Sequence, residues 1–431
     1  MSDKPRSRID AETPADIKSD GWSSLLSSYG TKRDPSEHIT PQHDRELQRE
    51  TVEAIYRSDG IGRRIIDLPA EEMTREWVSI HGDRGEDRES ELADLYAKQA
   101  FNKALRWAGL YGGSVMVLLV DDGQADLHEP LQEGRVRGVR DLVVYDRWQT
   151  SWTQADISTD PQSPYFGRAE RLQIHPIAGT PYTVHRSRVL VFDGEDVPDN
   201  LRQKNNGWGD SRLQPVFRSL SRYAEGLGAT SSIMRDFILP VLKMKNLSDM
   251  IASGQEDVIR KRLEILGVSR SILNTLLIDA DEEDYEKKAS SVTGIKDLLL
   301  ELKHNIASCT GMPQTKLFGR SPEGQNATGE SDTRNWYDQV KGEQEDKLIP
   351  NLSRLVYLLD LAGGGAPNDR EIVCKPLWQP SAQEQAETLD KLSQALTRLV
   401  VEAGLMDDEA AQDILRQNGF EPGEAIGRLE E

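Results

Sequence analysis

The segment Gly319-Arg-Ser-Pro-Glu-Gly-Gln-Asn-Ala-Thr-Gly329 contains three glycines, one proline and no apolar residue larger than alanine. A segment of this composition cannot build a hydrophobic core. It therefore predicts a loop that either faces solvent or lies against something large and polar. The charged residues in and beside it balance: Lys316, Arg320 and Arg334 against Glu323, Glu330 and Asp332.

Helical patterns lie on both sides of this loop. Before it, apolar residues recur at spacings of three and four, at Val292, Ile295, Leu298, Leu299, Leu302 and Ile306. The sequence Cys309-Thr-Gly-Met-Pro313 ends this helix, because a glycine followed by a proline stops helical structure. After the loop, a second pattern runs through Trp336, Tyr337, Val340, Leu348, Leu352, Leu355 and Leu359. Pro350 lies inside that pattern and predicts a kink, because it lacks an N–H and clashes with the carbonyl of Asp346.

The first half of the chain predicts one α+β domain, with helices packed against a mixed sheet. Ser114–Val120 is a continuous apolar run of strand length, and an Asp-Asp-Gly turn follows it. Further strands are expected at Leu142–Tyr145, Tyr182–Val184 and Val189–Phe192. Helices are expected from about residue 44, over Ile61–Leu68 with an end at Pro69, and over Phe101–Leu110. Residues 1–45 form a polar, proline-dotted arm in which Trp22, Leu25, Leu26 and Tyr29 make a small apolar island.

The second half predicts long helices around a small insert. A helix is expected from Asp210, with Asp210 or Ser211 as its N-cap, to about Phe237. Between Pro240 and Ser290 the pattern changes to strand, helix, strand. Glu371–Lys375 predicts one more strand, and residues 381–431 predict an acidic helical tail.

Composition excludes several classes of protein. The chain has 431 residues and carries 53 basic against 73 acidic side chains, a net charge of −20. A classical DNA-binding protein needs a basic face to replace the counterions of DNA, so this balance argues against one. An acidic wall suits a protein past which DNA slides without sticking. Two cysteines are too few for a disulfide framework. The N-terminus shows no signal peptide or membrane span, so we expect synthesis in a reducing cytosol.

Catalytic and ligand motifs are weak. Gly319-x4-Gly324 is similar to the opening of a phosphate-binding loop, but Gln325-Asn326 stands where Lys-Ser/Thr is required. His38-Ile-Thr40 and His185-Arg-Ser187 match the paired His-x-Ser/Thr motif of 2H phosphodiesterases, in which two histidines act as acid and base. This enzymatic interpretation stays open as the alternative. No metal-binding or cofactor-binding pattern is present.

One family resemblance covers nearly the whole chain, from about Tyr56 to Pro380. It rests on Thr310-Gly-Met-Pro-Gln-Thr-Lys-Leu-Phe-Gly319, on Ser321-Pro-Glu-Gly-Gln-Asn-Ala-Thr-Gly-Glu-Ser331 and on Asp332-Thr-Arg-Asn-Trp-Tyr-Asp338. Leu110-Tyr-Gly-Gly-Ser-Val-Met-Val-Leu118 and His185-Arg-Ser-Arg-Val-Leu-Val-Phe-Asp-Gly194 belong to the same set. In order and spacing these motifs resemble bacteriophage portal proteins, the head-to-tail connectors.

The resemblance implies a portal-type α+β fold with defined parts. These are a flexible arm (1–45), an α+β wing (46–209), a first stem helix (210–238), a clip (239–286), a second stem helix (287–309), a tunnel-loop region (310–331), a kinked helix with a return strand (332–380) and a helical crown (381–431). The crown is shorter than in larger portals. Such a protein has no active site and no cofactor.

The resemblance also implies partners and site residues. The protein would form a dodecameric ring at one capsid vertex of the virion, assembled in the host cytoplasm. Double-stranded DNA would pass through it, and it would dock the terminase large subunit, a head-tail adaptor and the major capsid protein. DNA-facing loop residues would be Lys316, Arg320, Ser321, Gly324, Gln325, Asn326, Thr328 and Gly329. Lys287, Lys288 and Lys296 would face the stem channel, and Asp279, Asp281, Glu282, Glu283 and Asp284 would form the clip contact.

Overall fold

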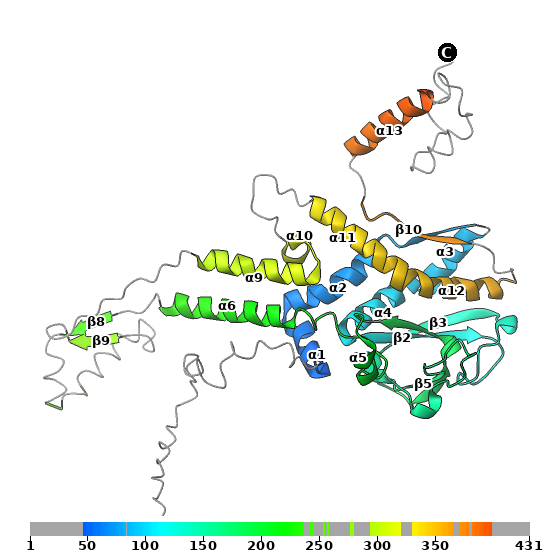
Figure 1. The fold of residues 1–431 in the computed structure, drawn as a ribbon, viewed down its shortest axis with the longest axis horizontal. Helices are drawn as coiled ribbons and strands as arrows, with labels where there is room; N and C mark the ends of the chain where they lie inside the picture. Colours follow the sequence, from blue (N-terminus) through cyan, green and yellow to red (C-terminus); the bar gives the residue numbers. More distant parts are fainter. Residues whose placement is uncertain are drawn as a thin grey trace, which may run out of the picture. The chain divides into compact units, whose positions relative to one another are not determined.

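The computed structural model describes residues 46–82, 84–236, 241–244, 253–254, 257, 276–279, 294–319, 330–364, 370–378 and 382–398. The chain divides into two units, Met1–Leu47 and Gln48–Glu431. The second unit holds the helices and strands described below, and it mixes the two kinds of element (Figure 1).

The helices are α1 (Arg49–Ser58), α2 (Gly60–Arg75), α3 (Gly85–Asp94), α4 (Ala97–Tyr111), α5 (Asp199–Lys204), α6 (Phe217–Asp236), α9 (Ile295–Thr310), α10 (Gln314–Phe318), α11 (Glu330–Glu343), α12 (Ile349–Ala362) and α13 (Ala382–Thr397). The strands are β1 (Val78–His81), β2 (Gly113–Asp121), β3 (Gly138–Asp146), β4 (Thr150–Ser151), β5 (Arg171–Ile174), β6 (Tyr182–His185), β7 (Val189–Asp193), β8 (Val241–Met244), β9 (Leu276–Asp279) and β10 (Glu371–Cys374). Short 3₁₀ turns are η4 (Glu133–Arg135), η5 (Arg147–Gln149), η6 (Gln154–Asp156) and η7 (Arg186–Arg188), and η9 (Gln344–Leu348) is a π-helical segment.

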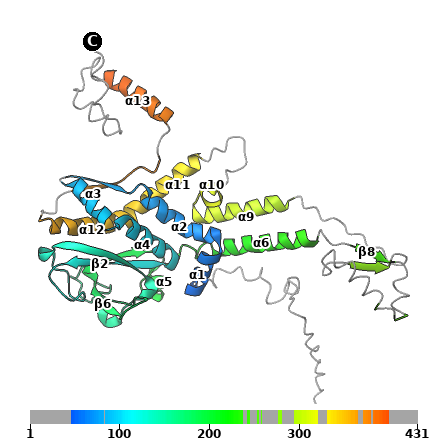
Figure 2. The same cartoon turned by 180° about the vertical axis from the view of Figure 1, so that it is seen from behind.

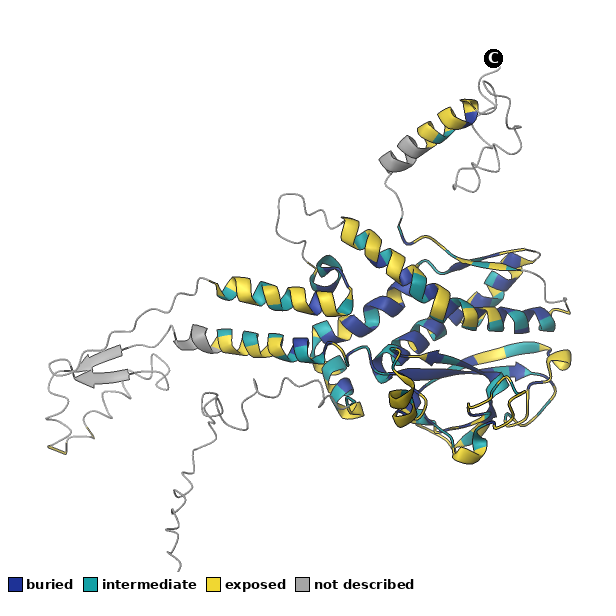
Figure 3. Cartoon of the chain, viewed as in Figure 1, coloured by how far each residue is buried: buried dark blue, intermediate teal, exposed yellow. Residues whose placement is uncertain are grey.

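Within residues 46–209, for which we use the label wing, strand β2 is the central strand of a three-stranded sheet in the order β3-β2-β7. Helices α4 and α12 contact one side of this sheet, and the small sheet β4-β5-β6 packs on the other. Val115 and Val117 join the core with Leu172 and Val184 of the small sheet. Because β2 is covered on both faces, its sequence is a continuous apolar run instead of an alternating one. The buried residues in Figure 3 gather along this strand and the helices beside it.

The wing strands expected from the sequence are present, but the expected mixed sheet is wrong for the described wing. All pairings of β2 with β3 and β7, and of β5 with β4 and β6, are antiparallel. The register of β2 against β3 shifts between Leu119 and Val120, which marks a β-bulge. The one parallel pair among the described strands is β8 with β9, at the two ends of the small insert.

The turn between α4 and β2 depends on close backbone approach. Gly112 has a φ of +84° and caps α4 in the left-handed region that glycine adopts readily. A Cβ placed on Gly113 would collide with the indole ring of Trp208, and one on Gly194 would collide with the backbone of Gly112. The glycines of the Tyr-Gly-Gly-Ser motif are therefore explained by packing.

Helices α6 and α9 run antiparallel and side by side (Figures 1 and 2). The Ser219 hydroxyl donates to Asn305 Oδ1 at 2.6 Å, and further along a Cβ on Gly226 would lie 3.0 Å from Leu302. The start of α6 differs from the expectation of Asp210. That residue pairs with Glu195 in a β-bridge, and the Arg212 N–H donates to the Gly109 carbonyl at 2.8 Å, so the helix begins only at Phe217.

The long helix after the glycine-rich loop consists of α11, η9 and α12, and Figure 1 shows a change of direction between α11 and α12. The π-helical segment Gln344–Leu348 ends directly before α12, and Pro350 lies in the first turn of α12. In a first turn the missing N–H of proline costs little, and the π segment takes up the irregularity of the backbone. Pro69, by contrast, was expected to end a helix, and α2 continues through it to Arg75.

Strand β10 pairs antiparallel with β1, so the segment after α12 lies beside the strand that follows α2. The strand at Glu371 was expected, whereas β1 was not. Arg88 reinforces this closure, because its Nε donates to Asp360 Oδ1 at 3.0 Å and both side chains are almost fully buried. Arg370 Nη1 also lies 2.9 Å from Asp360 Oδ1.

Candidate functional site

The two ends of the glycine-rich segment leave from helices that are joined by one partly buried cluster of charges. Helix α10 ends at Phe318, with Gly319 as its left-handed C-cap, and α11 begins at Glu330. Lys316 of α10 extends its ammonium to Glu72 Oε1 of α2 at 2.8 Å and to the Tyr337 hydroxyl of α11 at 3.1 Å. We call these three residues the loop-base junction.

Lys316 lies in a helix and not in the loop itself, and its expected DNA-facing role stays a prediction. Its charge is paired to Glu72. The side chain of Glu72 is only 6% exposed, so the carboxylate depends on its cations. Burial alone would lower the pKa of the Lys316 ammonium, but the hydrogen bonds to Glu72 and Tyr337 hold that pKa above its usual range.

A second cation completes the junction. The Arg75 guanidinium lies 5.4 Å from the centre of the Tyr337 ring and pairs with Glu72, while the Lys316 ammonium lies 5.1 Å from the same ring. Arg75 Nη2 also donates to the Leu377 carbonyl at 2.8 Å. The Tyr337 ring therefore contacts two cations. The contacts join α2, α10, α11 and the segment that follows β10.

The turn between α9 and α10 contacts the same helix α11. Gly311, with a φ of +67°, ends α9 as the sequence predicts. A Cβ on this glycine would lie 2.9 Å from the side chain of Gln339 on α11. The next residue, Met312, is 3% exposed, and its N–H donates to the Thr310 hydroxyl at 3.2 Å. Helix α9 thus leads into the loop-base junction through a close-packed turn.

Most of the other expected site residues lie outside the described residues. This holds for Arg320, Ser321, Gly324, Gln325, Asn326, Thr328 and Gly329 of the loop, for Lys287 and Lys288, and for Asp281, Glu282, Glu283 and Asp284. Of the expected clip and stem residues, Asp279 is the last residue of β9, and Lys296 is exposed in the first turn of α9. Their proposed roles stay predictions.

His185 has a structural role in the wing. It is the N-cap of η7, and its Nδ1 accepts from the Ser187 N–H at 3.2 Å. Its ring lies 6.0 Å from that of Tyr165, edge to face. The residue is buried, and desolvation lowers the pKa of its imidazole. His38, its proposed catalytic partner, lies outside the described residues.

The rest of the His-Arg-Ser-Arg-Val motif fastens the loop after β2. Arg188 Nη2 donates to Asp122 Oδ2 at 2.5 Å, with both side chains 1% exposed or less, and Arg188 Nε donates to the Glu129 carbonyl at 3.0 Å. The Leu131 N–H donates to the Ser187 hydroxyl at 2.9 Å. The motif therefore holds the segment 122–131 against the turn η7 by hydrogen bonds and an ion pair.

Sequence reasoning missed Glu72 and Arg75. Glu72 falls three and four residues after Pro69 and Leu68, on the buried side of α2. A carboxylate on an apolar stripe is the signal that a buried cation will face it. Among the described residues, no group of three or more His, Cys, Asp or Glu side chains is arranged to hold a metal ion. In the same part of the chain, no helix has the length and apolar character needed to cross a bilayer.

Comparison with protein families gives one match over most of the chain. A model described as phage portal protein matches residues 50–398. A protein of Haemophilus influenzae, described as uncharacterized, is 29% identical over 414 residues, which cover 93% of this chain and 90% of that protein.

Two further relatives carry the name anti-CBASS protein Acb1. The one from Caulobacter sp. is 28% identical over 95% of this chain and 68% of its own length. The one from Sphingomonas paeninsulae is 27% identical over 94% of this chain and 66% of its own length. About a third of each of these relatives thus lies outside the match.

Solved structures show the same fold at low sequence identity. The neck of an empty gene transfer agent particle, computed with C6 symmetry, has a chain that matches with a TM-score of 0.53 at 13% identity, over 88% of this chain and 96% of that one. The neck of the native particle, computed with C12 symmetry, matches with a TM-score of 0.50 at 14% identity, over 86% and 95% of the two chains.

Proposed function

We propose, from the premise that this chain belongs to the phage portal protein family, that it forms a closed ring through which double-stranded DNA enters and leaves a capsid. The observation that carries the proposal is the antiparallel pair α6 and α9, which leads through Gly311 and α10 into the loop-base junction. In this arrangement the two helices form the stem, and residues 320–329 form a collar around the passing DNA.

A ring of twelve copies suits this fold. The neck structures that share it were computed with C6 and C12 symmetry. A closed ring leaves no subunit surface at which a heterologous contact could continue, so a modest interface gives a stable assembly. The ring would occupy one capsid vertex of the virion after assembly in the host cytoplasm.

The mechanism is mechanical, and the protein needs no active site of its own. With a net charge of −20 on each chain, the ring would repel DNA and make only weak, non-specific contacts with it. The loop-base junction would hold both ends of the collar to helix α2. The terminase large subunit would hydrolyse ATP, and the β8–β9 insert would dock the terminase and later a head-tail adaptor. The wing would face the major capsid protein.

Deletion of residues 321–329 tests the collar. We expect the shortened protein to form rings that look normal by negative-stain electron microscopy, because the contacts of the junction remain. We expect the capsids that contain it to package or retain less DNA, measured as nuclease-protected genome per particle. A same-length replacement of the segment with Gly and Ser serves as the control for loop length. Full packaging and retention with the deletion would refute the collar.

The second candidate function is that of a phosphodiesterase that uses His38 and His185. We propose to test it because two relatives carry another name, anti-CBASS protein Acb1. The capping role of His185 argues against it, because the Nδ1 atom is already engaged with Ser187. The test is hydrolysis of bis(p-nitrophenyl) phosphate by the purified ring. Turnover that disappears in both His38→Ala and His185→Asn would support the enzyme and contradict the proposal of a portal without an active site.

A further inference from the structure

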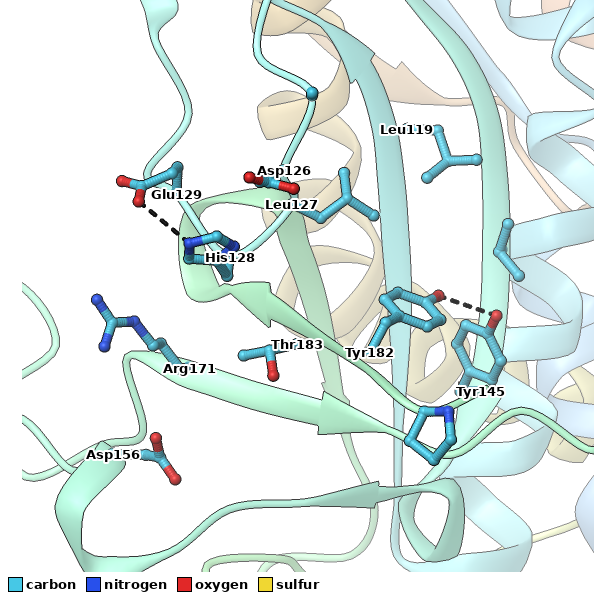
Figure 4. Close-up of a pocket in the computed structure, with 13 residues that line it drawn as sticks. Leu119, Asp126, Leu127, His128, Glu129, Tyr145, Asp156, Arg171, Tyr182 and Thr183 are labelled. Carbon is cyan, nitrogen blue, oxygen red and sulfur yellow. Dashed lines mark hydrogen bonds and ion pairs between the residues drawn. The ribbon is translucent and has the colours of Figure 1, made fainter. Parts of the chain in front are cut away.

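A groove of about 1050 Å³ opens at the side of the wing, where the small sheet meets β2 and β3 (Figure 4). It is formed by the ends of β2, β3, β5 and β6, by η6 and by the segment 125–129. Its lining residues are Leu119, Ala125, Asp126, Leu127, His128, Glu129, Val143, Tyr145, Asp156, Arg171, Pro181, Tyr182 and Thr183. None of them takes part in the loop-base junction or the stem.

One end of the groove is apolar. Figure 4 shows Tyr182 and Tyr145 side by side at this end, and the Tyr182 hydroxyl donates to the Tyr145 hydroxyl at 3.0 Å. Leu119 and Leu127 complete the apolar surface, and both are only partly buried although they pack against the wing core. Side chains of this kind form a surface that a partner residue can cover.

The other end is charged, with an excess of acid. It carries three carboxylates and one guanidinium, those of Asp126, Glu129, Asp156 and Arg171. With a neutral His128 imidazole, the sum of these charges is two negative charges. His128 Nε2 lies 3.2 Å from Glu129 Oε1. A basic group in the ligand would therefore be attracted to this end.

Strand β6 offers the backbone groups of one residue, Thr183, to the groove. In the order β4-β5-β6 it is an edge strand. The Arg186 N–H donates to the Glu170 carbonyl on the β5 side, and the His185 N–H donates to the Leu127 carbonyl on the opposite side, at 2.9 Å. In an antiparallel ladder successive residues alternate in this way, so both backbone groups of Thr183 face away from β5. No described residue forms a backbone hydrogen bond with Thr183 on that side.

The faces of β6 determine which side chains a new strand would need. Val184 is fully buried toward β2, whereas Thr183 and Arg171 share the exposed face. A residue paired with Thr183 would point outward, and its two neighbours would point toward the apolar surface with Tyr182.

We propose that this groove binds an extended segment of a partner protein whose backbone pairs with Thr183 at the edge of β6. The segment has apolar residues at alternate positions and a lysine or arginine at the acidic end. The charge excess selects a basic segment, the exposed edge of β6 selects an extended one, and the apolar surface between the sheets selects the alternation. This site is independent of the DNA conduit.

The test uses a defined probe, fluorescein-labelled acetyl-Lys-Val-Thr-Val-Lys-amide, titrated with the full-length ring and followed by anisotropy. The first comparison peptide carries an N-methyl group on the threonine nitrogen, and the second has glutamate in place of both lysines. Thr183→Pro removes the edge N–H, and Thr183→Ala retains it as the matched control. Asp126→Asn reduces the negative charge of the acidic end.

We expect saturable binding that weakens about tenfold with the N-methyl peptide and with Thr183→Pro, because each removes a backbone hydrogen bond. Thr183→Ala should bind as the parent does, and the glutamate peptide should bind more weakly than the lysine peptide. Asp126→Asn should likewise weaken binding of the lysine peptide. Equal affinity of the parent and N-methyl peptides would mean an apolar pocket without strand addition and would overturn the proposal, as would the absence of saturable binding by the parent peptide.

Discussion

Single residues matter most in this protein where the backbone packs closely against another group or where a charge is buried. Gly113 is pressed against Trp208, and Arg188 is enclosed with Asp122. Both kinds of position belong to motifs that sequence analysis assigned to the portal resemblance as a whole. The structure gives each kind of residue its own reason. The glycines allow close packing, and the charged residues hold one loop in place.

Gly113→Ala should destabilise the wing by about 2 kcal/mol or more, because the new methyl group would overlap the Trp208 indole and force the backbone to shift. Gly109→Ala is the matched control. Gly109 lies inside α4 with no atom within 4 Å of a Cβ placed on it, so alanine should stabilise the helix slightly. Chemical denaturation of both variants checks the prediction, and equal stabilities would contradict it.

His185 should make the wing sensitive to mild acid. Because desolvation lowers the pKa of its imidazole in the folded state, the unfolded chain binds the proton more readily. The contribution of neutral His185 to the free energy of unfolding is therefore fully present above the unfolded-state pKa of about 6.5. It is lost as the pH falls through that value toward the pKa of the folded state. His185→Asn keeps an acceptor for the Ser187 N–H but does not titrate. Melting temperatures between pH 7.5 and pH 5 should fall more for the parent than for this variant. Parallel curves would refute the prediction.

Among the elements, α10 has the largest influence for its size. It spans only Gln314–Phe318, yet its one lysine joins α2 to α11 at the base of the loop. Helix propensity cannot account for the stability of so short a helix. It is stable because Leu317 is buried and because Lys316 neutralises a carboxylate that has almost no access to water.

Lys316→Met should therefore cost about 2 kcal/mol of stability, since Glu72 loses one of its two cations. Lys341→Met is the control, because Lys341 is 70% exposed and makes only a distant pair with Glu345. Denaturant unfolding gives the magnitude, and hydrogen exchange of α10 and α11 gives the location. A change of less than about 0.5 kcal/mol would show that Arg75 alone supports the carboxylate.

At the scale of the whole molecule, the paired helices leave apolar side chains uncovered. Leu298 of α9 is 60% exposed and Leu227 of α6 is 42% exposed in the single chain. In the proposed ring, the stem helices of the adjacent copy would cover them. Burial of such side chains between subunits is the usual source of interface energy.

Leu298→Glu should prevent or weaken ring formation and leave the secondary structure of the subunit unchanged, because it places a charge where a neighbouring helix would pack. Ile177→Glu is the control, since Ile177 is 98% exposed in a wing turn. Sedimentation velocity separates rings from single subunits, and circular dichroism confirms folding. Rings of normal stability with Leu298→Glu would place the subunit interface elsewhere.

Local patterns predicted much of the fold. The apolar run of β2, the strands β6 and β7, the end of α9 at Gly311 and the strand at Glu371 all follow from periodicity and turn chemistry. The errors occurred where distant segments decide. Asp210 was expected to cap a helix, but its backbone pairs with Glu195, and β1 was missed because four residues carry too little pattern to stand out.

The candidate site was predicted less well than the fold. The sequence indicated the loop by its lack of apolar residues, and it indicated the helices on either side. It assigned Lys316 to that loop, because a lysine beside glycines appears exposed until its partner is known. The partner, Glu72, is more than two hundred positions away, and only the folded chain brings the two together at 2.8 Å.

The sequence by itself determined the strands β2, β3, β6, β7 and β10, the helices on either side of the glycine-rich loop, the place of that loop and the acidic character of the chain. Periodicity, charge and turn residues act between near neighbours, so a local pattern is enough for these features. Only the tertiary structure decided which charges are buried, where α6 begins and which edge of β6 is open. Those properties depend on contacts between residues far apart in the chain, whose free energy no local pattern contains.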